Sequence, residues 1–179
     1  MAKQTSKKKP VKGAAPLPSS APEKHVRPSW DEYFIEIMHA AAKRATCDRG
    51  RSGSVIAKDR QVLATGYVGS PPGQPHCDEV GHEMHKVIND DGVISEHCIR
   101  TIHAEQNVLM QAAKGGVSVE GATLYCQMTP CYVCAKLIVA AGIKRVVSFR
   151  DYQRGEKSKA LFAKAGVQYD LVHSDTERY

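Results

Sequence analysis

The stretch TIHAEQNVLM, residues 101–110, places a His and a Glu in front of an apolar run with helical spacing. Further along, MTPCYVCAKL, residues 128–137, places two cysteines three residues apart at the start of a second such run. A β-rich segment at 122–126 lies between the two stretches. Strands that alternate with helices indicate a sheet covered by helices, so these stretches predict an α/β fold.

The pattern extends in both directions from this centre. Ser29 and Glu32 form a capping box that begins a helix running to about Thr46. Residues 53–67 read as a hairpin, and residues 69–102, rich in Gly, Pro, His and Asp, read as one long loop. The remaining helices are expected at 103–114, 131–141 and 158–165, and the remaining strands at 122–126, 144–149 and 167–172.

The chain has 179 residues and a formal charge of +6. Residues 1–28 hold seven Lys and Arg against one Glu, which accounts for the whole excess, and residues 29–179 are neutral. The N-terminal segment has no aromatic residue, and its composition predicts a disordered basic tail before one folded domain at 29–179. The tail is either a solubilising leader or an electrostatic tether to nucleic acid, and the leader is favoured because a basic tail without a partner motif is weak evidence for binding.

The sequence also bears on the compartment. It has no apolar run of membrane-spanning length and no apolar core of a secretory signal near its N-terminus. We therefore expect a cytoplasmic protein without membrane contact. In that reducing setting the six cysteines are metal ligands or free thiols rather than disulfides.

Four residues of the two opening stretches point to chemistry. His103 begins one predicted helix, and Cys131 and Cys134 begin another, after Pro130. One imidazole and two thiolates leave the fourth position of a tetrahedral Zn²⁺ open for water, which is typical of a catalytic zinc. Glu105 is then free to move protons as a general acid and base. The order H-x-E … P-C-x-x-C is the pattern of zinc deaminases that act on nucleobases.

Other interpretations of these residues remain. A lone CxxC also occurs in redox motifs and in structural zinc sites, and a fourth protein ligand would close the site. A zinc-stabilised binding module that has lost catalysis would keep the cysteines, but it would have no need of Glu105. The paired motifs in this order favour catalysis.

A second set of possible ligands surrounds the predicted loop. Cys47, Cys77 and Cys98, together with His82, would make a closed Cys₃His zinc site that staples the loop. Three buried free cysteines are the alternative. Three further histidines compete with His82 for the fourth position: His76, His85 and His97. Cys126 fits a strand in the core and is assigned no role.

With these residues placed, the chain resembles the deoxycytidylate (dCMP) deaminase family of the cytidine deaminase-like superfamily. The resemblance spans about residues 29–173. It rests on SWDEYF, KRATC, GY-x-G-x-P, PHCDEVG, HCIRTIHAEQN, GVSVEGATLY, TPCYVCAKLI and AGIKRVV. It implies a three-layer α-β-α fold with a central mixed five-stranded sheet. It also implies hydrolysis of dCMP to dUMP and ammonia, which supplies dUMP for thymidylate synthesis.

The resemblance further implies roles for single residues and partners. His103, Cys131 and Cys134 look like the ligands of the catalytic zinc, Glu105 like the proton shuttle, and Tyr152 like a substrate contact. Cys47, Cys77 and Cys98 match positions that hold a second zinc in some members, and His82 stands where many bacterial members have a Cys. The family also implies a homo-oligomer, often a hexamer. It implies dCTP and dTTP as effectors, with Mg²⁺ accompanying the nucleotide.

One position departs from the family pattern. Val68 stands where the family has the Asn of GYNG, and a valine cannot hydrogen-bond to a sugar hydroxyl. The alternative substrates are therefore another cytosine nucleotide or a base within nucleic acid, as in tRNA adenosine deaminases. The neutral domain argues against nucleic acid, because strand-binding surfaces need a basic groove.

Overall fold

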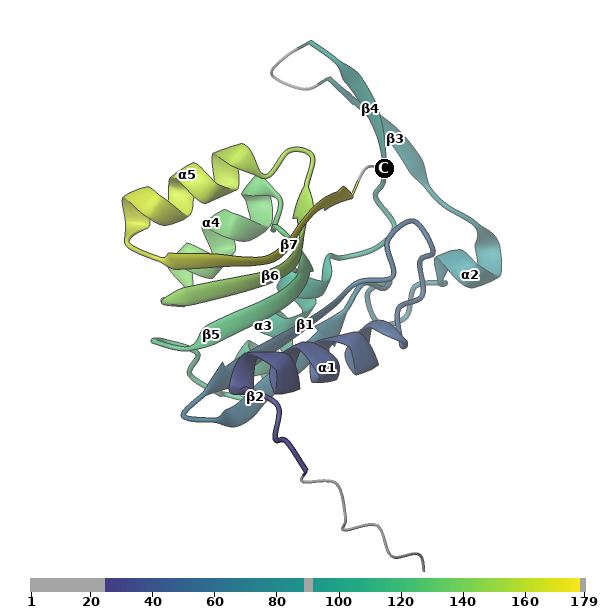
Figure 1. Ribbon diagram of the computed structural model, residues 1–179. Helices are drawn as coiled ribbons and strands as arrows, with labels where there is room; N and C mark the ends of the chain where they lie inside the picture. Colours follow the sequence, from purple (N-terminus) through teal and green to yellow (C-terminus); the bar gives the residue numbers. More distant parts are fainter. Residues whose placement is uncertain (1–24, 89–91, 178–179) are drawn as a thin grey trace, which may run out of the picture.

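A mixed five-stranded sheet forms the centre of the molecule (Figure 1). The computed structural model describes residues 25–88 and 92–177. The strand order is β2-β1-β5-β6-β7, in which β1 pairs antiparallel with β2 and β5, whereas β5, β6 and β7 run parallel. The strands are β1 (Gly53–Lys58), β2 (Gln61–Tyr67), β5 (Thr123–Met128), β6 (Arg145–Tyr152) and β7 (Gln168–Glu177). This sheet confirms the predicted α/β fold.

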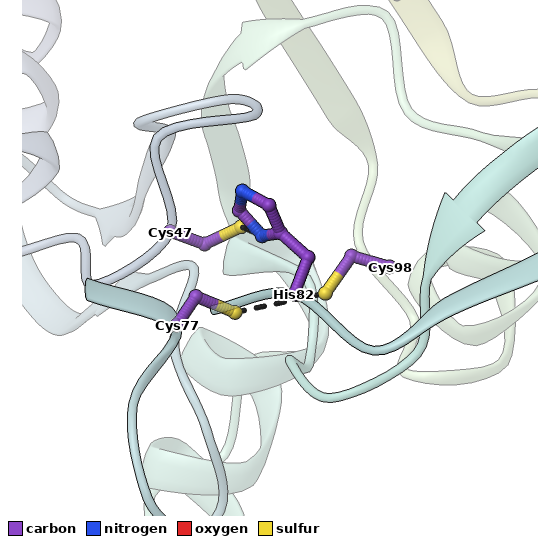
Figure 2. A group of neighbouring side chains, drawn as sticks. All are labelled: Cys47, Cys77, His82 and Cys98. Atoms are coloured by element: carbon purple, nitrogen blue, oxygen red, sulfur yellow. Dashed lines mark hydrogen bonds between the residues drawn. The ribbon is translucent and has the colours of Figure 1, made fainter. Parts of the chain in front are cut away.

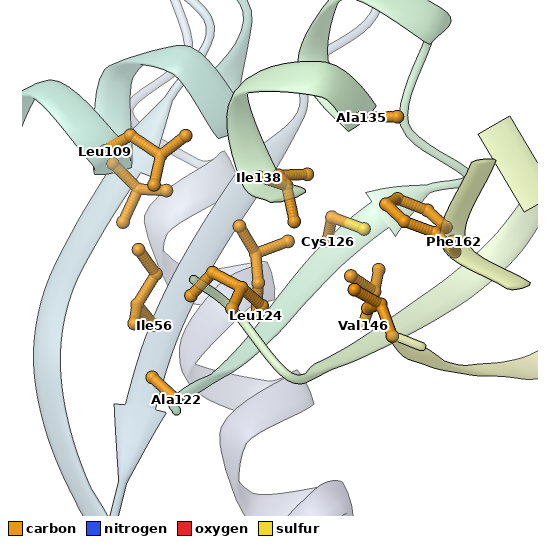
Figure 3. Close-up of a cluster of buried hydrophobic side chains, with 12 residues drawn as sticks. Ile56, Leu109, Ala122, Leu124, Cys126, Ala135, Ile138, Val146 and Phe162 are labelled. Atoms are coloured by element: carbon orange, nitrogen blue, oxygen red, sulfur yellow. The ribbon is translucent and has the colours of Figure 1, made fainter. Parts of the chain in front are cut away.

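Helices cover both faces of the sheet. Helix α1 (Trp30–Ala42) packs Phe34, Ile35 and Met38 on one face, against Val55 and Tyr125 among others. The other face carries α3 (Ala104–Lys114), α4 (Tyr132–Ala140) and α5 (Glu156–Ala165). Figure 3 shows the core on this side, where buried side chains of the helices meet those of β1, β5 and β6. The three-layer arrangement is the one that the family resemblance implied.

Local chemistry begins and positions the helices next to the sheet. The Ser29 hydroxyl accepts a hydrogen bond from Glu32 N–H, and Glu32 returns one to Ser29 N–H, so the predicted capping box is present. A Cβ at Gly66 would lie 2.4 Å from the backbone nitrogen of Val108. Only glycine allows β2 and α3 to approach so closely, and this approach fixes where α3 begins.

Ion pairs link α1 to the sheet at the end of the strands where the β1–β2 turn lies. Arg145 of β6 contacts both carboxylate oxygens of Asp31 in α1, at 2.7 and 2.8 Å, and it also contacts Asp170 in β7. The Tyr125 hydroxyl donates a further hydrogen bond to Asp31. The hydrogen bonds to Arg145 lower the pKa of the Asp31 carboxyl, although burial opposes them. Ion pairs and this hydrogen bond thus connect α1 with β5, β6 and β7.

The expectation of an irregular loop at 69–102 was wrong. This segment contains a short helix, α2 (Cys77–Val80), and an antiparallel hairpin of β3 (Met84–Ile88) and β4 (Ile94–Cys98). Figure 1 shows the hairpin projecting from the body of the molecule. Most of its side chains are exposed or half-buried, so the alternation of apolar and polar residues that marks a half-buried strand is missing.

Smaller differences concern where elements end. Helix α1 ends at Ala42 rather than near Thr46, because the Thr46 N–H joins the chain to Val68 O instead of continuing the helix. No helix within the described residues is long and apolar enough to cross a membrane. The predicted basic tail falls mostly in residues 1–24, outside the part of the chain that the structure describes.

Candidate active site and second metal cluster

The candidate active site lies where parallel strands end and helices begin. Cys131 is the N-cap residue of α4, directly after β5, and His103 is the N-cap residue of α3. Ligands commonly bind in the crevice outside the carboxyl ends of parallel strands. Both helix N-termini carry partial positive charge, which stabilises thiolates. The N-termini of α3 and α4 therefore lie close together at the carboxyl end of the parallel strands.

The three predicted zinc ligands converge at this end of the sheet. His103 Nδ1 lies 3.6 Å from Cys131 Sγ and 3.4 Å from Cys134 Sγ, and all three donor atoms lie within 4.8 Å of one another. Donors that bind one tetrahedral zinc at the usual bond lengths lie about 3.5–3.8 Å apart. The donor set and its spacing therefore fit Zn²⁺. His103 is exposed, Cys131 half-buried and Cys134 buried, so the cluster opens to solvent on one side.

Electrostatics couple these three side chains. The Cys131 pKa is lowered to about 4, first by a hydrogen bond from the Cys134 thiol and then by His103. The Cys131 thiolate in turn raises the pKa of His103 to about 9. Cys134, which supplies the hydrogen bond and is buried, has a raised pKa. The protein alone thus holds one thiolate here, and a bound divalent cation would stabilise the second.

Glu105 is the one acidic side chain in the first turn of α3. It is 7% exposed, and this burial raises the pKa of its carboxyl, with the negative Cys131 acting in the same direction. His103 opposes the shift. A carboxyl with a raised pKa beside a metal cluster is suited to moving protons near neutral pH.

Tyr152 ends strand β6 beside the same cluster. Burial raises the pKa of its phenol, and the negative charge of Cys131 adds to the shift. A polar network holds the loops around it: Thr129 Oγ1 donates to Asp151 at 2.7 Å, and Lys159 Nζ contacts the other carboxylate oxygen at 2.8 Å. Asp151 also accepts from Tyr152 N–H, so the network fixes the backbone that carries Tyr152.

The second cluster contains the four side chains that the sequence predicted. Figure 2 shows Cys47, Cys77, His82 and Cys98 pointing toward one another. The Cys77 and Cys98 sulfurs are 3.6 Å apart, and Cys47 Sγ lies 3.7 Å from His82 Nδ1. These separations also fit one tetrahedral zinc, here with all four positions filled by protein.

His82 is the histidine that the structure places in this cluster. Its Nε2 lies 2.9 Å from Asp48, which fixes the ring so that Nδ1 faces the thiols, as carboxylates commonly do for metal-bound histidines. The competing histidines lie elsewhere: His76 contacts Thr46, His85 pairs with His97 across the hairpin, and His97 contacts Ser95.

Val68 packs against the second cluster. It is 8% exposed and belongs to a buried group with Ala45, Cys47 and Cys77. Its backbone pairs with Thr46 and Ser52. The residue that departs from the family pattern thus contributes apolar packing around the second cluster. Cys126, as expected, is buried in the core and contacts Ser148.

Sequence reasoning missed two cationic residues near the candidate active site. Arg49 follows Cys47 in the loop after α1, and Arg154 lies between β6 and α5. Burial lowers the pKa of the His97 imidazole, and the positive charges of Arg154 and Arg49 lower it further. His103 acts in the same direction, whereas Cys131 opposes the shift. Neither arginine belongs to a spaced motif, and their proximity follows only from the fold.

Zinc-dependent deamination is the chemistry that such an open cluster beside a buried Glu serves. The chain belongs to the family described as the cytidine and deoxycytidylate deaminase zinc-binding region, whose profile matches residues 28–150.

Named relatives and a solved structure agree with this family. The chain is 40% identical to ComE operon protein 2 of Bacillus subtilis, over 83% of this chain and 74% of that protein. It is 39% identical to the deoxycytidylate deaminase of Schizosaccharomyces pombe over 79% of this chain, and it spans 44% of that longer protein. A crystal structure of a cyanophage S-TIM5 dCMP deaminase with dCMP and dUMP has a TM-score of 0.65 at 28% identity, covering 82% of this chain and 99% of that one.

Proposed function

We propose that this protein hydrolyses dCMP to dUMP and ammonia, and so supplies dUMP for thymidylate synthesis. The observation that carries the proposal is the convergence of His103, Cys131 and Cys134 beside the buried Glu105. Support for the substrate comes from relatives named deoxycytidylate deaminase, such as the Schizosaccharomyces pombe protein, and from the related phage enzyme that holds dCMP and dUMP.

The proposed mechanism divides the work among these residues. His103, Cys131 and Cys134 would hold the zinc, which supplies Lewis acidity and lowers the pKa of water to about 7. Glu105 accepts the proton of the attacking water and delivers protons to the ring nitrogen and the leaving amine. Its burial keeps bulk water away from that proton transfer. Tyr152 contacts the nucleotide at the rim of the site.

The direct test is ammonia release by zinc-loaded protein. The substrates are dCMP, CMP, deoxycytidine, dCTP and an oligonucleotide containing cytosine and adenine, each with and without residues 1–28. We expect preference for dCMP, unaffected by the tail. Activity on the oligonucleotide alone, lost with the tail, would instead identify a nucleic-acid deaminase.

We also infer that Cys47, Cys77, His82 and Cys98 bind a second, structural zinc. The support is the four-donor geometry and the Asp48 contact to His82. Such an ion would tie the loop after α1, helix α2 and the base of the β3–β4 hairpin together. This role is structural because no coordination position is left for water or substrate.

The remaining expectations concern context. We propose a homo-oligomer, as the family's hexamers suggest, regulated by dCTP and dTTP with Mg²⁺. We place the protein in the cytoplasm, where its six free cysteines would stay reduced. The basic segment at 1–28 is proposed to be a disordered leader with no part in catalysis. Sedimentation analysis with and without dCTP and Mg²⁺ tests the assembly.

A further inference from the structure

Two buried residues connect strand β5 to the metal ligand Cys131. Thr129 is 2% exposed, and Pro130 is fully buried. The Thr129 N–H donates a 3.0 Å hydrogen bond to Arg150 O, which continues the pairing of β5 with β6 beyond the end of β5. Because proline fixes its own φ angle, the position of Thr129 largely determines where the Cys131 backbone lies. The three-donor cluster that contains Cys131 consists of His103, Cys131 and Cys134.

The side chain of Thr129 is held by two further elements. Its hydroxyl donates to Asp151 Oδ1 at 2.7 Å. Since a hydroxyl has one hydrogen, the 2.8 Å contact with the Tyr169 hydroxyl is one in which Thr129 accepts. A Cβ at Gly155 would lie 2.8 Å from Thr129 Cγ2, so the turn after β6 packs directly on Thr129. Any movement of this turn or of Asp151 is therefore passed to Thr129.

The carboxylate of Asp151 joins three parts of the chain. Its Oδ1 accepts from the Thr129 hydroxyl and from Tyr152 N–H at 2.8 Å, and its Oδ2 accepts from Lys159 Nζ at 2.8 Å. Burial raises the pKa of Asp151, but these hydrogen bonds outweigh burial and the pKa is lowered. The ionised carboxylate can only accept hydrogen bonds, so it holds all three donors at once. Lys159 of α5 anchors it from the side of the helix layer.

We propose that Asp151 is a positioning residue that keeps Cys131 and Tyr152 at a fixed separation across the candidate active site. It acts on Cys131 through Thr129 and on Tyr152 through the peptide N–H. The part that concerns substrate binding rests on the proposed dCMP deaminase function, whereas the part that concerns metal binding does not. Outer partners of this kind commonly change metal affinity or activity by about 10–100-fold when they are removed.

The first test separates the two routes by substitution. Thr129→Val removes the hydroxyl but leaves the hydrogen bond from Tyr152 N–H to Asp151. The affinity of the three-donor cluster for Zn²⁺, measured by competition with a chromophoric chelator, should fall about tenfold, while KM for dCMP stays near that of wild type. Asp151→Ala breaks both routes, so it should lose zinc affinity to the same extent and also raise KM for dCMP severalfold.

A double variant tests whether Asp151 acts on the metal ligand through Thr129. Thr129→Val combined with Asp151→Ala should bind zinc no more weakly than Asp151→Ala alone, because both changes break one route. Additive losses would contradict that route. Asp151→Asn should keep zinc affinity near that of wild type, since its amide oxygen still accepts both hydrogen bonds. Cys134→Ser, which lacks one of the three donors, identifies which zinc is released from this cluster.

Asp170→Asn is the matched control. Asp170 is a carboxylate of β7 that also pairs with a cation, Arg145, away from Thr129. This variant should leave both zinc affinity and KM unchanged, although it too removes an ion pair. An equal loss of zinc affinity in Asp170→Asn would mean general destabilisation and would overturn the positioning role.

The metal measurements also separate this inference from the proposed function. Unchanged zinc affinity in Thr129→Val and Asp151→Ala would overturn the positioning role even if dCMP is deaminated. Failure of wild type to release ammonia from dCMP would instead contradict the proposed function. Zinc affinity needs no turnover, so it would still decide whether Asp151 positions Cys131.

Discussion

The two Cys/His clusters differ in the number of donors and in the elements that hold them. The three-donor cluster is built on the first residues of α3 and α4, which are packed against the central sheet. The four-donor cluster joins a loop, the short helix α2 and the hairpin base. A buried Glu105 accompanies the first, whereas a carboxylate from Asp48 orients a ligand in the second.

This difference supports our proposal that similar ligands serve catalysis in the first cluster and structure in the second. A cluster on a rigid scaffold can leave a coordination position open, because the fold does not depend on the ion. A cluster that ties separate loops together fills all four positions with protein ligands, since metal binding at such a site contributes to folding. Substitutions in the three-donor cluster should therefore mainly lower activity, and substitutions in the four-donor cluster should mainly lower stability.

The largest effect is expected from Cys134→Ser in the three-donor cluster. Losing a ligand should remove one zinc equivalent and lower kcat/KM for dCMP by roughly 10³-fold or more, because the water loses its activation. The melting temperature should stay near that of wild type with the second zinc bound. Metal analysis, ammonia release and thermal melting measure the three quantities.

Cys126→Ser is the matched control, because Cys126 is a buried thiol of the core that belongs to neither cluster. It should keep both zinc equivalents and its activity, while it loses some stability. If Cys134→Ser retained wild-type activity, the assignment of catalysis to the three-donor cluster would be wrong.

The next effect is expected from Cys77→Ser in the four-donor cluster. This variant should also lose one zinc equivalent, but the loss should appear mainly as stability, with a melting temperature lower by about 5 °C or more. Its kcat should remain within a few-fold of wild type, because Glu105 and the three-donor cluster are untouched. Full stability with a single zinc in wild type would contradict a structural second ion.

The smallest effect is expected from Asp31→Asn, far from both clusters. The Arg145 contact lowers the pKa of Asp31, so its stabilisation is present above the unfolded pKa of about 3.9 and is lost as pH falls through the folded value. The pair is partly exposed, so the loss at pH 7 should be only about 0.5–1 kcal/mol. Denaturant unfolding at pH 7 and pH 3 should show the difference from wild type shrinking in acid.

Glu36→Gln on the exposed face of the same helix is the control and should be neutral at both pH values. Zinc content should be unchanged in both variants. A pH-independent loss in Asp31→Asn would mean that packing, and not charge, links α1 to β6.

Sequence reasoning identified the three-donor cluster because its information is local. The spacing within each motif already predicts which side chains lie together at one helix N-terminus. His103 and Glu105 belong to one helix, and Cys131 and Cys134 to the other. The alternating helices and strands then bring the two starts to one sheet edge. The second cluster was harder, because residues far apart in sequence meet there and four histidines were candidates. Only the fold places His82 beside Asp48.

The β3–β4 hairpin and the two arginines near His97 lay beyond sequence reasoning for a related reason. Strands β3 and β4 expose most of their side chains, so they lack the apolar alternation that marks a strand packed on a core. Arg49 and Arg154 come near His97 from different loops, and nothing in their local sequence relates one to the other. Such features depend on long-range contacts, which periodicity cannot reveal.

The most direct test of the central claim is the steady-state rate of ammonia release from dCMP by zinc-loaded Glu105→Gln protein. Gln keeps the size of the side chain but cannot take up a proton, so kcat should fall about 10²–10⁴-fold. Both zinc ions and the folded state should be retained. Deamination by the variant at the wild-type rate would contradict the account, because Glu105 could not then be the group that moves the proton.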